Sequence, residues 1–217
     1  QIESAIESWR EKKAAAGMLG VTQKPPTLAT VDPTLINKPA IGKQQILQLI
    51  AAPNNGLDSN EKAWAIMRIE AMDEAKLADL TFLIAPPTTA GGKVQYSGSY
   101  SHLHRLMRVV ARSGDDVKVL HELYHHVTKF VKPEDRMRIE NYRQQEIKRL
   151  RDKPDRTQAE TEFLVYLDTN GGVVTSEDFL KSRRADWIDL YPLVNTDEFY
   201  VFNLTESGRR ACKDQEA

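Results

Sequence analysis

The sequence has one cysteine, Cys212, among its 217 residues. A single thiol cannot form an internal disulfide, so we do not expect a disulfide-stabilised secreted domain and expect a reducing compartment. No apolar run approaches the roughly 20 residues that a membrane-spanning helix requires. The first residues form a polar helical pattern, without the basic and apolar blocks of a secretory signal. These absences predict a cytoplasmic protein that does not insert into a membrane.

The signatures of several large enzyme classes are also missing. The chain has no phosphate-binding loop of the Walker type, no glycine pattern for a dinucleotide, no nucleophile elbow and no cysteine cluster. Most common enzyme classes therefore lose support, and we expect no organic cofactor.

What is present is typical of a folded protein, with 41% hydrophobic and 28% charged residues. The net charge of −1 conceals an asymmetry. Residues 101–156 carry 14 Lys and Arg against 9 Asp and Glu, an excess of five positive charges, whereas residues 157–217 carry 6 against 12, an excess of six negative charges. The two regions suit different partners.

The order of periodic segments and breakers predicts a mainly α protein with three parts. These are an N-terminal helix with a proline-rich linker over 1–40, an irregular helical bundle over 41–156, and a small α+β module over 157–217. Within the bundle, we expect helices near 41–52, 59–72, 73–85, 99–113, 115–131 and 133–152.

The last sixty residues read as three short helices, an alternating strand and a final helix. The segment YVFNLTESGRRA at 200–211 resembles the strand-and-helix end of bacterial winged-helix regulators. The resemblance implies a winged-helix-like module with a strand near 199–204 and with Trp187, Tyr191 and Phe199 in its interior. The remaining core positions that we predict are Phe163, Leu164, Leu167, Phe179, Leu180, Ile188, Leu193, Phe202 and Leu204.

Two groups of basic residues could contact nucleic acid or an acidic partner. The resemblance would place Lys181, Arg183 and Arg184 at the start of the third helix of the module, but Asp186 and Asp189 follow them and would repel phosphates. The basic helix in 132–156 contributes Arg143, Lys148, Arg149 and Arg151, interleaved with Glu140 and Glu146. Direct DNA binding by the module is therefore not favoured.

The sharpest motif is HELYHH at 121–126. His121, Glu122 and His125 match H-E-x-x-H, which resembles the active helix of zinc metallopeptidases. The resemblance implies that the two imidazoles bind zinc and that Glu122 activates water as the general base. An amphipathic helix with surface histidines would show the same pattern.

The context of the motif departs from the peptidase pattern. No strand is evident just upstream, and no characteristic third ligand follows. Candidates for that ligand are Glu140, Glu146, Glu160 and Glu162, none of which the sequence singles out. We therefore expect no third ligand near the two histidines, which would border a helix-packing surface.

These observations support three hypotheses. The first is a non-catalytic adaptor that joins protein partners in a larger complex through the helical body and the acidic module. The second is a zinc-dependent metallopeptidase that uses His121, Glu122 and His125. The third is a nucleic-acid-associated protein that uses the basic helix.

Overall fold

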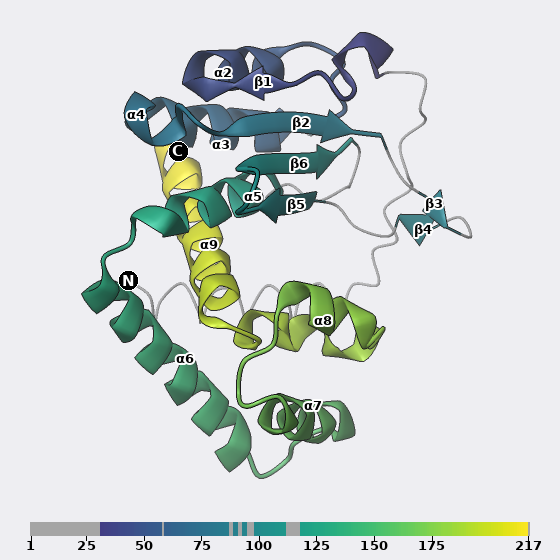
Figure 1. Cartoon of the computed structure of the whole chain (residues 1–217), viewed down its shortest axis with the longest axis vertical. Coiled ribbons are helices and arrows are strands. Elements are labelled where there is room, and N and C mark those ends of the chain that lie inside the picture. The colour runs from purple at the N-terminus through teal and green to yellow at the C-terminus, as the bar shows by residue number, and fades with distance from the viewer. Residues whose placement is uncertain are drawn as a thin grey trace. The chain divides into compact units, whose positions relative to one another are not determined.

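The computed structural model describes residues 31–57, 59–86, 89–90, 93–94, 98–111 and 118–216. This part of the chain is mainly helical and contains a small mixed sheet of four strands (Figure 1). The chain divides into two compact units, one formed by Gln1–Lys129 with Leu204–Ala217 and the other by Phe130–Asn203. One long helix, α9 (Thr196–Glu216), begins in the second unit and ends in the first.

The four-stranded sheet belongs to the first unit and has the order β1, β2, β6, β5. Its strands are β1 (Ala40–Ile41), β2 (Thr81–Ala85), β5 (Gly98–Ser101) and β6 (Leu106–Val110). The two central strands, β2 and β6, are parallel, while β1 and β5 pair with them in antiparallel fashion. A separate antiparallel pair joins β3 (Thr89–Ala90) to β4 (Lys93–Val94). Strand β6 is therefore the element that precedes the HELYHH helix, whereas the sequence pattern shows no evident strand just upstream of it.

Helices cover this sheet and supply most of its hydrophobic core. They are α2 (Gly42–Ala51), α3 (Ser59–Glu70), α4 (Glu74–Leu77) and α5 (Lys118–Val127), with the 3-10 turns η2 (Pro33–Leu35) and η3 (Thr128–Phe130). Helix α5 packs against β5, β6 and α3. Trp64, Phe82, Met107 and Leu120 are fully buried, so α5 rests on an apolar layer that fixes its position.

The second unit has a core of its own. It contains α6 (Pro133–Asp152), α7 (Gln158–Thr169), α8 (Ser176–Lys181) and the 3-10 segment η4 (Ala185–Leu193), together with the start of α9. The core residues are Ile147, Phe163, Leu164, Leu167, Val174, Phe179, Trp187 and Val194. The ring of Trp187 lies edge-on to Phe163 at 5.7 Å between centroids. Trp187 and Phe199 are buried as predicted.

Several predicted helices are confirmed. The expectations for 41–52, 59–72 and 133–152 correspond to α2, α3 and α6, and the described part of 115–131 forms α5 and η3. The predicted N-terminal helix lies outside the described residues. Among the described helices, none has the length and apolar character needed to cross a bilayer.

Two predicted helices in the first unit were wrong. The segment 73–85 forms only the short α4 before it continues as β2, and 99–113 forms β5, a turn and β6 in place of a helix. In β6, Met107, Val109 and Val110 are buried, and β2 and β5 pair with this strand on its two sides. Residues 106–110 form a strand because they pair with β2, which is distant in the sequence. The local periodicity of the segment does not reveal such a distant partner.

The predicted strand near 199–204 was also wrong, since these residues are helical and belong to α9. Over residues 198–206, α9 is buried on more than one side, so the apolar residues of this part do not follow a single helical stripe. The winged-helix-like module is therefore not confirmed. Two of its predicted core residues, Leu180 and Ile188, are 65% and 56% exposed.

Candidate metal site

The polar residues of helix α5 are buried together with its apolar ones. His121 and His125 are each 8% exposed, Glu122 is 5% exposed and His126 is fully buried. Polar groups are costly to bury unless partners satisfy them. This burial argues against the alternative in which HELYHH belongs to an amphipathic helix with histidines at its surface.

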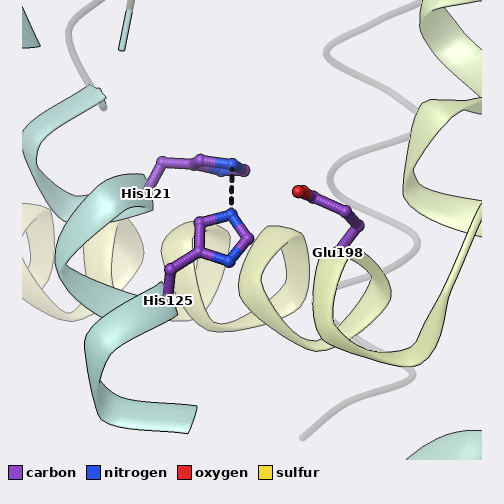
Figure 2. A group of neighbouring side chains, drawn as sticks. All are labelled: His121, His125 and Glu198. Atoms are coloured by element: carbon purple, nitrogen blue, oxygen red, sulfur yellow. Dashed lines mark hydrogen bonds between the residues drawn. The ribbon is translucent and has the colours of Figure 1, made fainter. Parts of the chain in front are cut away.

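The two motif histidines lie one helical turn apart and face each other. Their Nε2 atoms are 3.3 Å apart, and their rings meet at 76° (Figure 2). Two nitrogens that each lie about 2.0–2.1 Å from one tetrahedral zinc ion are separated by roughly 3.3–3.4 Å. The observed separation of the two nitrogens therefore fits a shared zinc ion, and without an ion it is a hydrogen-bond distance between the two imidazoles.

The neighbouring histidine, His126, has a different role in α5. Its Nε2 lies 2.8 Å from the backbone oxygen of Lys76, and its Nδ1 lies 2.7 Å from the hydroxyl of Tyr100 in β5. The carbonyl can only accept, so Nε2 carries the proton, and Nδ1 accepts a hydrogen bond from Tyr100. Burial lowers the pKa of His126 and raises the pKa of Tyr100 to about 12, so both groups are neutral near pH 7. This pair connects α5 to the edge strand β5 and to α4.

The carboxylate of Glu198 lies in the first turn of α9. The backbone N–H of Glu198 donates to the side-chain oxygen of Asn195 at 2.9 Å, which caps the helix and fixes its start. Glu198 Oε1 accepts hydrogen bonds from the hydroxyls of Ser176, at 2.8 Å, and Tyr191, at 2.9 Å. These two donors, from α8 and η4, orient a buried carboxylate that is 4% exposed.

Within the described part of the chain, one group of side chains could supply three ligands to a metal ion. It consists of His121 and His125, on α5 of the first unit, and Glu198, in the first turn of α9 in the second unit (Figure 2). The expectation that no third ligand would lie near the histidines stays a prediction, because Glu198 belongs to the second unit. A signal for Glu198 exists in the sequence, because Asn195 followed by Glu three residues later is a helix-start pattern. We instead read the following residues as a strand.

The four glutamates that we had considered as ligands have other roles. Glu140 accepts from Arg143 and Gln144, and Glu146 pairs with Arg149. Glu160 closes the capping box at the start of α7, and Glu162 pairs with Arg184. These contacts of the four carboxylates all lie within the second unit.

The basic residues that could have met nucleic acid are largely engaged within the second unit. Arg143 is fully buried, where it donates to the backbone oxygens of Gly172, Leu193 and Val194. Five of the other basic residues form ion pairs: Lys148 with Asp152, Arg149 with Glu146, Arg151 with Asp168, Lys181 with Glu177, and Arg184 with Asp186. The exception is Arg183, whose backbone φ is +52°. Arg184 also lies over the ring of Trp187, 4.3 Å from its centroid. The structure therefore gives Arg143 a structural role in place of the predicted surface contact.

Comparison with known proteins adds no analogy to this site. No family model, no curated protein and no solved structure matches the chain. Its chemistry has to be argued from the side chains themselves.

Proposed function

We propose that this protein is a zinc-dependent hydrolase that cleaves peptide bonds. The observation that carries the proposal is the 3.3 Å separation of the His121 and His125 Nε2 atoms on an H-E-x-x-H helix. His121, His125 and Glu198 would hold the ion, and two histidines with one glutamate are a known ligand set of catalytic zinc. Such a set leaves a position open for water and substrate.

The donor chemistry of these residues fits zinc. Imidazole nitrogen and carboxylate oxygen are its usual ligands. The Ser176 and Tyr191 hydroxyls donate to Glu198 Oε1, and ligating carboxylates are commonly held by such hydrogen bonds. When bound, zinc would act as a Lewis acid that makes a water molecule more acidic and polarises a carbonyl group.

Glu122 would be the general base. It lies next to His121 in α5 and is 5% exposed, so its carboxylate is shielded from bulk water. Its oxygen would accept the proton of the attacking water, and the same group would then pass that proton to the leaving amine. The ligand role and the base role thus fall on different residues, and an experiment can separate them.

The decisive experiment is zinc quantification on protein purified without a metal-affinity step. We expect about one zinc ion per chain. We expect its loss in His121→Ala, His125→Ala and Glu198→Ala. Asp197→Asn is the matched control for Glu198, because it alters the adjacent acidic residue, which pairs with Arg136. It should retain the metal.

A second measurement tests catalysis. Glu122→Gln should retain zinc and lose the cleavage of a fluorescence-quenched peptide library, because the change removes the base and leaves the ligands. General base catalysis contributes about 10²–10⁴-fold to a rate, so the loss should be of that order. Wild-type protein that neither retains zinc nor binds it at micromolar concentration would contradict the proposal. The adaptor hypothesis, which rests on missing enzyme signatures, would then be the better one.

A further inference from the structure

Gly98, the first residue of the edge strand β5, lies directly against Glu122. Gly98 pairs with Val109 of β6. A Cβ atom added to Gly98 would lie 2.8 Å from Glu122 Oε1 and 3.0 Å from Glu122 Cγ. Real Cβ atoms essentially never approach another heavy atom more closely than 3.0 Å. The side chain of Glu122 therefore occupies the space that any other residue at position 98 would need.

The backbone does not explain this glycine. The described glycines with positive φ are Gly42, Gly56, Gly171 and Gly172, whereas Gly98 lies in a regular antiparallel strand where any residue could adopt the backbone. A glycine inside a strand weakens the strand and commonly marks a place where another group approaches closely. Here that group is the carboxylate of Glu122.

We propose that Gly98 is a positioning residue that sets the place of the Glu122 carboxylate for catalysis. This inference rests on the proposed function, since it assigns Glu122 the role of general base. The three atoms closest to the added Cβ belong to Glu122 and Arg108, the third being the backbone oxygen of Arg108 at 3.2 Å. A methyl group at position 98 would thus act first on the base and leave the histidine ligands in place.

The test is Gly98→Ala in the full chain. We expect kcat for the fluorescence-quenched peptides to fall about 100-fold, the loss that a displacement of roughly 1 Å can cause. Zinc content and zinc affinity should stay within about twofold of the wild type, because the ligands do not change. Ser99→Ala, at an exposed position of the same strand, is the matched control and should preserve both quantities.

A double variant separates positioning from general damage to the fold. Gly98→Ala should lower the rate no further in a Glu122→Gln background, because the base is already lost. If the two losses multiply, or if Gly98→Ala alone retains wild-type kcat while Glu122→Gln is inactive, this inference is wrong and the proposed function stands. If the wild type has no zinc and no Glu122-dependent activity, both fail.

Should Gly98→Ala fold poorly, its stability provides the test. The additional change Glu122→Ala removes the side-chain atoms that the new methyl group would meet. The thermal midpoint of the double variant should therefore lie above that of Gly98→Ala and close to that of Glu122→Ala alone. No recovery would show that the clash lies elsewhere and would overturn the inference.

Discussion

At the scale of single residues, two hydroxyl groups orient the carboxylate of Glu198, the proposed third ligand. Ser176 and Tyr191 both donate to Oε1, which fixes the plane of the carboxylate before any ion arrives. A ligand held in this way loses less conformational freedom on binding than a mobile glutamate would.

We therefore expect Tyr191→Phe to weaken zinc binding by about 10–100-fold, the usual effect of removing a hydrogen bond to a metal ligand. Competition with a chelator of known affinity measures this change. Tyr166→Phe is the control, because the Tyr166 hydroxyl donates instead to the backbone oxygen of Asp178. Equal zinc affinities in Tyr191→Phe and the wild type would contradict the assigned role of the hydroxyl.

How far the site could be predicted depends on the distance between its parts in the sequence. The positions of His121, Glu122 and His125 are local, so a motif reveals them. Glu198 comes from a helix far along the chain, and its neighbours Phe199, Val201 and Asn203 alternate with more exposed residues as in a strand. The Asn195 cap is the local signal for a helix here, whereas the predicted strand rested on the alternation and the winged-helix resemblance.

At the scale of elements, one neutral imidazole adds polar contacts to the apolar packing between α5 and its neighbours. His126 joins α5 to Tyr100 of β5 and to the backbone of α4, with Asp79 Oδ1 at 3.5 Å from its Nε2. Asp79 is itself paired with Lys129 and Arg105. Protonation of His126 would remove the acceptor that Tyr100 uses.

This contact predicts how stability depends on pH. Because burial lowers the pKa of His126 in the folded state, the unfolded chain takes up a proton near its ordinary pKa of about 6.5 before the folded chain does. The contribution of His126 to stability is therefore complete above that pH and decreases as the pH falls through and below it, by at most about 1.4 kcal/mol per pH unit.

Urea unfolding at pH 7.5 and pH 5.5 measures this effect. The wild type should lose more free energy of unfolding between these two values than His126→Gln does. His104→Gln, at an exposed position, should behave like the wild type. The same pH dependence in all three proteins would show that His126 is not the responsible group.

Sequence patterns predicted elements well where the deciding signals are local. Helix α6 begins with Pro133 followed by Glu134 and Asp135 and ends with Arg149 and Arg151, charges that the helix dipole favours at these ends. The strands β2 and β6 have no such local signal. They are defined by their parallel pairing with each other, across an intervening segment that includes β3, β4 and β5.

At the scale of the whole molecule, zinc should stabilise the fold by mass action. A ligand that binds only the folded state adds about 2.7 kcal/mol to the free energy of unfolding when its concentration is 100 times its dissociation constant. We expect this increase in the wild type and in Glu122→Gln, but not in Glu198→Ala. Chemical unfolding of metal-free protein with and without added zinc measures it. Stabilisation of Glu198→Ala equal to that of the wild type would place the ion elsewhere.

The division of the chain into units has a consequence for the order in which the protein is made. The second unit is one uninterrupted stretch, Phe130–Asn203, whereas the first unit needs residues from Leu204 onward. Ribosomes release a chain from its N-terminus, and domains generally fold as units during synthesis. The second unit is therefore complete in the nascent chain before the first one, which has all four strands of its sheet by then but still lacks the part of α9 that follows Asn203.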